Sequence, residues 1–149
     1  MILRLTVFLF IIFSILSCKK DDDPIPAGSF SVESATLNGN SANGQRGIGL
    51  TPSFVFKFSK KVDINTVDGN VRISGYSNSL NISVTYSTIS MTPVQPLNYL
   101  TKYEVIIGSE LKSIDNITLN NEFDFEFYTL LDPSDKFPRI SDEGLLDSV

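Results

Sequence analysis

The chain has 149 residues, 42% of them hydrophobic, which is enough for one domain with a buried core. Its 12 basic and 17 acidic residues give a net charge of −5, and this acidic balance argues against a nucleic-acid partner. The sequence contains no histidine and no tryptophan, so it lacks the commonest general base, the commonest metal ligand and the best sugar-stacking ring. We therefore expect neither an enzyme site nor a cofactor in this chain.

The first 17 residues have the proportions of a secretory signal peptide. Arg4 supplies an early positive charge, and an apolar run follows from Leu5 to Ile15. This run is shorter than the about 20 apolar residues that a membrane-spanning helix needs. We therefore predict that residues 1–17 form a signal peptide that is removed from the mature protein.

The only cysteine, Cys18, stands directly behind this apolar run, in the stretch Ile15-Leu16-Ser17-Cys18. The stretch resembles the lipobox of bacterial lipoproteins, in which the cysteine is lipidated and becomes the new N-terminus. A free or disulfide-bonded cysteine is the alternative, but a single cysteine has no partner within the chain. From this resemblance and the signal peptide before it, we predict a lipid anchor at Cys18. One acyl chain binds a membrane only reversibly, whereas two or three anchor a protein stably.

Five consecutive charges follow the cysteine, namely Lys19, Lys20, Asp21, Asp22 and Asp23. They resemble the export tag behind the lipid cysteine in surface lipoproteins of Bacteroidetes, which implies an outer-membrane lipoprotein exposed at the cell surface. The alternative is a solvated charge block that only extends the tether, and such a protein would face the periplasm. The residues up to Ser29 are rich in proline and glycine, so we predict a disordered linker over residues 18–29.

From Phe30 onward, apolar and polar residues alternate in short segments, which is the pattern of half-buried β-strands. Turn residues such as Asn38-Gly39 separate these segments. Because each strand has only one apolar face, we predict a two-sheet β-sandwich over residues 30–131, with a barrel as the alternative. Its core includes Phe54, Phe56, Phe125 and Phe127. The seven predicted strands cover residues 30–37, 53–59, 71–74, 81–86, 89–94, 103–107 and 123–129.

Three stretches in this region carry a family resemblance. They are LTPSFVFKFSKKVDINTV at residues 50–67, PVQPLNYLTKYEVII at 93–107, and Asp115-Asn116 followed by FEFYT at 125–129. In order and spacing they resemble the bacterial Ig-like domain of the S-layer SbsA type, which implies an all-β, Ig-like sandwich and is nearly silent on function. Ile117 stands where the family usually has a glycine, so we expect that turn to be built differently.

The remaining aromatic and acidic residues offer two candidate binding sites. Four tyrosines are expected at the surface but lie on separate segments, so they predict no sugar-stacking platform: Tyr76, Tyr86, Tyr99 and Tyr128. Five acids raise the question of calcium: Asp63, Asp68, Asp115, Asp124 and Glu126. No loop has the D-x-D-x-D-G spacing of a calcium site, so we favour a solvated acidic face.

The last residues no longer alternate. Ser141, followed by Asp142 and Glu143, predicts the start of a helix, and Leu145-Leu146 begins an apolar face. The stretch KFPRISDEGLLDSV, at residues 136–149, resembles the start of the glucoamylase-like (α/α)-barrel domain of glycan-degrading Bacteroidetes lipoproteins. We therefore expect residues 132–149 to be a linker and the beginning of a helical domain. A frayed tail is the alternative.

These patterns together predict a non-catalytic Ig-like spacer or accessory module of a cell-surface lipoprotein, forming the N-terminal part of a glycan-degrading enzyme. The alternative is a stand-alone adhesion or glycan-binding lipoprotein. The expected partners are the membrane, through the anchor at Cys18, and either a glycan or a catalytic domain that follows in the same chain.

Overall fold

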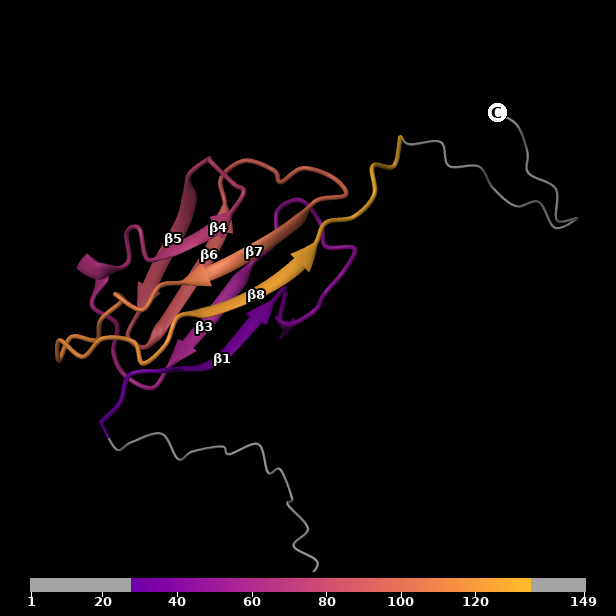
Figure 1. Ribbon diagram of the computed structural model, residues 1–149. Coiled ribbons are helices and arrows are strands. Elements are labelled where there is room, and N and C mark those ends of the chain that lie inside the picture. The colour runs from indigo at the N-terminus through magenta and orange to yellow at the C-terminus, as the bar shows by residue number, and fades with distance from the viewer. Residues whose placement is uncertain (1–27, 135–149) are drawn as a thin grey trace, which may run out of the picture.

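The computed structural model describes residues 28–134, and Figure 1 colours this part of the chain. The predicted signal peptide, Cys18, the charged residues 19–23 and the helix start at Ser141 lie outside the described residues. The predictions made for them, and the domain division that depends on them, stay predictions.

Strands dominate the described chain. They are confirmed for all seven predicted segments, with ends that differ from the predicted ones by two residues at most. The sequence does not predict the two-residue strand β2 or the short 3-10 helix η1, because neither is long enough to show a period. The elements are β1 (Val32–Leu37), β2 (Asn40–Ser41), β3 (Phe54–Phe58), η1 (Ile64–Thr66), β4 (Val71–Ser74), β5 (Leu80–Thr85), β6 (Thr88–Pro93), β7 (Lys102–Ile107) and β8 (Phe123–Tyr128).

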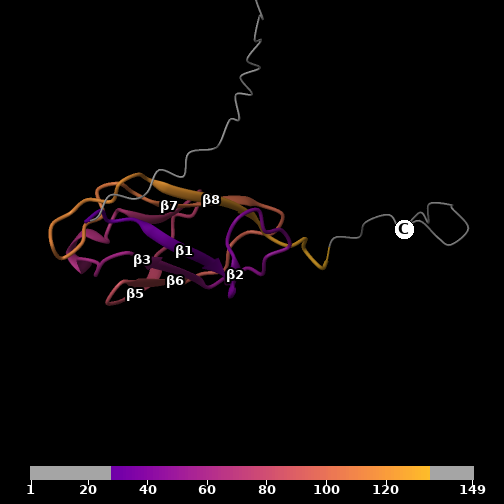
Figure 2. The same cartoon turned by 90° about the horizontal axis from the view of Figure 1, so that it is seen from below.

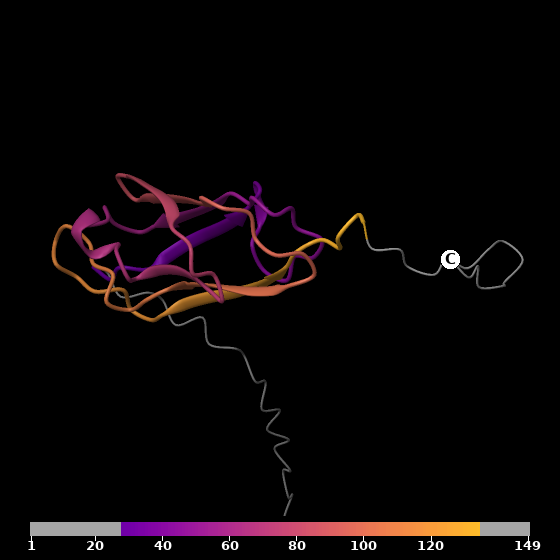
Figure 3. The same ribbon diagram turned by 90° about the horizontal axis from the view of Figure 1, so that it is seen from above.

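The strands form two sheets that face each other, as Figures 2 and 3 show from opposite sides. One sheet has five strands in the order β2-β1-β3-β6-β5, and the other has three in the order β4-β7-β8. All neighbouring strands are antiparallel. The predicted all-β sandwich is therefore confirmed, and the barrel alternative is wrong because the two sheets do not join into one.

Local chemistry explains two of the turns. Asn38 and Gly39 both have positive φ, 52° and 82°, which is the two-residue hairpin turn that Asn-Gly favours between antiparallel strands. The turn that lacks the usual family glycine is built on Asn116, whose φ is 60°. The side chain of Ile117, in the place of that glycine, packs against the core.

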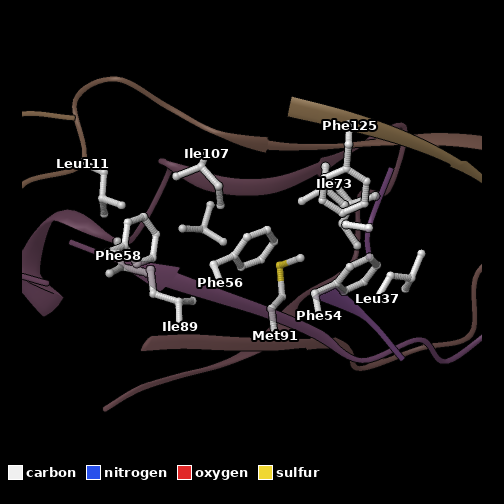
Figure 4. Close-up of a cluster of buried hydrophobic side chains, with 14 of the residues drawn as sticks. Leu37, Phe54, Phe56, Phe58, Ile73, Ile89, Met91, Ile107, Leu111 and Phe125 are labelled. Carbon is white, nitrogen blue, oxygen red and sulfur yellow. The ribbon is translucent and has the colours of Figure 1, made fainter. Parts of the chain in front are cut away.

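The core lies between the sheets and is rich in phenylalanine. Figure 4 shows Phe54, Phe56 and Phe58 of β3 pointing into this space, with Phe125 on the opposite sheet. The Phe54 ring centroid lies 5.4 Å from that of Phe127 and 6.2 Å from that of Phe125. Burying a side chain of this size stabilises a fold by about 1.5–3 kcal/mol. The four phenylalanines predicted for the core are all at least 95% buried, which confirms that prediction.

The described chain begins and ends at opposite ends of the sandwich, as Figures 1 and 2 show. At the end where the described chain begins, Phe30 forms a parallel bridge with Leu119, which precedes β8. At the end where the chain leaves, Thr129, which follows β8, forms a parallel bridge with Ile48. Because β1 and β8 run in the same direction, the chain enters beside the start of β8 and leaves at its end. No helix in the described part of the chain is long and apolar enough to cross a membrane.

Candidate functional site

The four tyrosines predicted at the surface have different environments. Tyr86 and Tyr99 are exposed, at 75% and 39% of their surface, as predicted. The prediction for Tyr76 is wrong, because its ring packs against the core and its hydroxyl donates to the Gln95 carbonyl at 2.8 Å. Tyr128 is also only half-exposed, since the Arg46 guanidinium lies 4.5 Å above its ring.

The two exposed tyrosines lie at opposite ends of the sandwich. Tyr86 forms the β5–β6 turn, and its carbonyl accepts a hydrogen bond from Val62 N–H, near the end of β3. Tyr99 belongs to the loop before β7, beside the residues that follow β8. The two rings therefore cannot form one stacking platform for a sugar.

The acidic residues do not gather into one place either. Asp63 caps the helix η1, where its carboxylate accepts the Asn65 N–H at 3.1 Å, and Asp68 and Asp115 lie in separate exposed turns. Among the described residues, no three His, Cys, Asp or Glu side chains approach closely enough to hold a metal ion. Asp124 and Glu126 lie on the outer face of β8, which agrees with a solvated acidic stripe.

An exposed ion pair lies on that outer face. Lys102 on β7 forms an ion pair with Glu126 on β8. The Glu126 carboxylate raises the pKa of Lys102 above its ordinary value. Glu104 stands directly opposite Glu126 in the β-ladder, so Lys102 also screens two like charges from one another. Arg72, on β4, extends this charged face and pairs with Glu122 at 3.9 Å.

The outer face of the five-stranded sheet has the opposite character. The register aligns Ser41, Thr36, Val55, Ser90 and Ser83 in one row across all five strands. We call this surface the hydroxyl face. Among the described residues in its paired register, Lys57 is the only charged one. The register places eight serines and threonines on it: Ser34, Thr36, Ser41, Ser83, Thr85, Thr88, Ser90 and Thr92. A shallow hollow of about 240 Å³ lies between β5 and β6 on this side.

A second surface feature runs along the edge of the other sheet. Three adjoining hollows, of about 230, 320 and 350 Å³, follow β8 from Asn120 to Tyr128. The first two share Val32 and Phe123, and the last two share Asn43, Asp124 and Phe125, so the three form one groove. We call it the β8 groove. Its second wall is β1 and the segment from Ser41 to Arg46.

The sequence pattern does not reveal either surface. The hydroxyl face joins residues of five strands. The alternation of apolar and polar residues shows where each strand lies in the sequence, but not the order of the strands in the sheet. The β8 groove lies between two strands that belong to different sheets. The residues that sequence reasoning singled out, Cys18 and the charged run behind it, lie outside the described part of the chain.

Comparison with known proteins adds the family. Residues 23–129 match the bacterial Ig-like domain family. The chain belongs to this family. The predicted Ig-like resemblance is thereby confirmed, and Ig-like domains are generally non-catalytic modules.

The other comparisons add little to the Ig-like assignment. No curated protein matches the sequence. Among solved structures, the crystal structure of the N-terminal part of the bacterial S-layer protein SbsC is similar, with 23% sequence identity and a TM-score of 0.43. The similarity covers 69% of this chain but only 24% of the crystallised SbsC chain, so this chain spans about a quarter of the structure that it matches.

Proposed function

We propose that this Ig-like domain is a non-catalytic spacer of a cell-surface lipoprotein, anchored through Cys18 and carrying a glycan-degrading domain behind it. The observation that supports a spacer is the position of the two chain ends at opposite ends of the sandwich. A domain whose chain enters at one end and leaves at the other separates the preceding and following segments by its full length.

The lengths suit that role. Fully extended, the eleven residues from Lys19 to Ser29 span about 35 Å. A six-residue strand such as β8 adds about 20 Å of rigid length. Linker and sandwich together hold a following domain well clear of the lipid headgroups.

The anchor is tested by metabolic labelling with an acyl-chain analogue. The wild type should take up the label, whereas Cys18→Ala should lose it and accumulate a larger, uncleaved precursor. Ser17→Ala is the matched control, because it keeps a small residue before the cysteine and should retain the label. Label on the Cys18→Ala variant would contradict the anchor.

The surface location is tested by adding protease to whole cells. Replacing Asp21, Asp22 and Asp23 together by alanine should leave the protein lipidated but reduce its cleavage. A control that removes the same charge elsewhere is the replacement of Asp135, Asp142 and Asp147, which should leave cleavage unchanged. Equal cleavage of both variants would mean that the charged run is only a tether.

The following domain is tested by reading the DNA beyond the Val149 codon. An in-frame continuation that encodes a helical glycan-degrading domain supports the proposal. A stop codon directly after Val149 contradicts this part of it.

The hydroxyl face favours a second candidate, a glycan-binding or adhesion module. Serine and threonine hydroxyls both donate and accept hydrogen bonds, as sugar hydroxyls do. A glycan array probed with the full chain distinguishes the two functions. Binding that is lost in Ser83→Glu or Ser90→Glu but kept in Ser109→Glu, on an exposed turn, would support the glycan-binding module. A blank array would support the spacer.

A further inference from the structure

The edge of β8 that faces away from β7 has unused backbone hydrogen-bonding groups. Thr129 N–H donates to the Thr101 carbonyl on the β7 side, whereas Tyr128 N–H donates to the Gln45 carbonyl on the opposite side. Because backbone groups alternate in direction along a strand, Asp124 and Glu126 point the same way as Tyr128. Among the described residues, no hydrogen bond engages the N–H or C=O groups of Asp124 and Glu126 on this edge.

The two ends of the same edge are covered. Tyr128 exchanges hydrogen bonds with the 45–48 segment, since its carbonyl also accepts the Ile48 N–H at 3.0 Å. Before β8, Asn120 N–H donates to the Phe30 carbonyl at 3.0 Å. Both covering segments form parallel bridges beside the strand. The open stretch is therefore the middle of the edge, about four or five residues long, or roughly 15 Å.

The β8 groove lies directly beside this open stretch. Its central hollow, of about 320 Å³, is lined on one side by Phe123, Asp124 and Phe125 and on the other by β1. On this edge β1 pairs with β2 at Thr36 and Leu37, and the Ala35 carbonyl accepts the Ala42 N–H at 3.2 Å. The start of β1, before Ala35, has no strand partner on this edge among the described residues. Figure 2 shows β8 in one layer and β1 in the other along the same side of the sandwich. An extended chain would find space and free hydrogen-bonding groups in one place.

The chemistry of the walls alternates. Asp124 and Glu126 face outward along β8, while Phe123 and Phe125 face the core, and Phe123 is only half-buried. Glu33, on the opposite wall, is the extra residue of a β-bulge in β1 and is exposed. Neither Glu33 nor Asp124 forms an ion pair with another described residue, whereas Glu126 is paired with Lys102 and Glu122 with Arg72. The groove also contains one base, Arg46, over the Tyr128 ring.

We propose that the β8 groove binds an extended segment of a partner protein, which adds as a strand to the free edge of β8. The segment has Lys or Arg at alternate positions, beside Asp124 and Glu33, and apolar residues between them, beside Phe123. Main-chain hydrogen bonds supply affinity in this mode and alternate side chains supply specificity. This function goes beyond that of a spacer.

The acids argue against a second copy of the chain as the occupant. Two β8 edges paired with each other would bring Asp124 and Glu126 close to their own counterparts, and like charges across a strand pair are destabilising. Charged residues on an edge are a common protection against self-association. The same charges attract a basic strand.

The test uses the full chain, labelled with ¹⁵N and kept in mild detergent, with the peptide acetyl-Lys-Val-Lys-Val-Lys-Val-amide as the probe. The peptide should slow hydrogen exchange of the Asp124 and Glu126 amides by about ten-fold or more, since they gain hydrogen-bond partners. The same peptide with every backbone nitrogen methylated keeps its charges and side chains. It should bind about ten-fold more weakly or worse, because it cannot donate main-chain hydrogen bonds.

Two variants at one position separate the backbone from the charge. Glu126→Ala removes the carboxylate but keeps the N–H, whereas Glu126→Pro removes both and spares the ladder to β7. Glu126→Pro should bind the peptide about ten-fold more weakly than Glu126→Ala. Asp124→Asn should weaken binding and Asp115→Asn, outside the groove, should not.

Several outcomes would overturn the proposal. They are equal binding of the methylated and unmethylated peptides, equal binding by Glu126→Ala and Glu126→Pro, and no binding at millimolar peptide. If Glu126→Pro does not fold, the exchange of the Asp124 and Glu126 amides in the wild type decides. Unchanged exchange in the presence of bound peptide would place the peptide elsewhere.

Discussion

Strands β3 and β8 have the same pattern, three phenylalanines at alternate positions, but different places in the sandwich. β3 lies in the middle of the five-stranded sheet, with β1 on one side and β6 on the other. Its phenylalanines Phe54, Phe56 and Phe58 are all at least 99% buried. β8 lies at the edge of the three-stranded sheet, with β7 as its only neighbouring strand.

The difference shows that the neighbouring strands, rather than the alternation of phenylalanines, decide whether the backbone edge of a strand is paired or open. In β3 both backbone edges and one face are used for stability. In β8, Phe127 is fully buried, but Phe123 is half-buried and the middle of the outer edge has no partner among the described residues. β8 therefore contributes to the core, and part of its backbone edge stays open among the described residues.

The largest effect should come from the centre of β3. Phe56→Ala should lower the free energy of unfolding by about 3–5 kcal/mol, because the cavity it leaves cannot easily collapse. The Phe56 ring contacts both Phe123 and Phe125 of the facing sheet. Urea unfolding of the full chain measures the loss, with the exposed Ser53→Ala as control. A loss under about 1 kcal/mol would mean that β3 is not the centre of the core.

A pair of proline substitutions compares the two backbones directly. Lys57→Pro should cost about 3 kcal/mol, since β3 is hydrogen-bonded on both sides and proline removes a ladder bond. Glu126→Pro should lower the free energy of unfolding by about 1 kcal/mol or less, because the Glu126 N–H lies on the open edge of β8 and points away from β7. Because Glu126 is ion-paired with Lys102, each proline variant is compared with the alanine variant at the same position, Lys57→Ala or Glu126→Ala, so that the remaining loss comes from the backbone. Equal losses in urea unfolding would show that β8 is not an edge in solution.

A smaller effect is expected at the start of β8. Phe123→Ala should cost about 1–2 kcal/mol, less than Phe56→Ala, because half-burial removes less apolar surface from water. Phe127→Ala, at the buried end of the same strand, should approach the loss seen for Phe56. If Phe123→Ala costs as much as Phe127→Ala in the same experiment, Phe123 is covered by something outside the described residues.

The smallest effect should come from removing the residues after Leu131. Truncation there should change the free energy of unfolding by under about 0.5 kcal/mol, as a surface change does. A large loss would indicate that Leu145 and Leu146 dock on the sandwich. The tail would then complete this domain, and the case for a following catalytic domain would weaken.

Sequence alone predicts the local part of this fold. The alternation of residues such as Phe54 and Phe56 is set by the strand itself, so all seven long strands and the phenylalanine core are found. The surroundings of Tyr76 are not, because its hydroxyl is bound by Gln95, nineteen residues away. The β8 groove is equally hidden, since β3 and β8 share one pattern and only the strand order makes β8 an edge.

The central claim is that β3 is paired on both edges and β8 on only one. Hydrogen exchange of single backbone amides in the full chain, without any peptide, tests it most directly. All amides of β3 should exchange slowly, as should those of Phe125 and Phe127. The Asp124 and Glu126 amides should exchange about a hundred-fold faster than these neighbours. Protection of Asp124 and Glu126 equal to that of Phe125 would contradict the account, because the edge of β8 would then already be occupied.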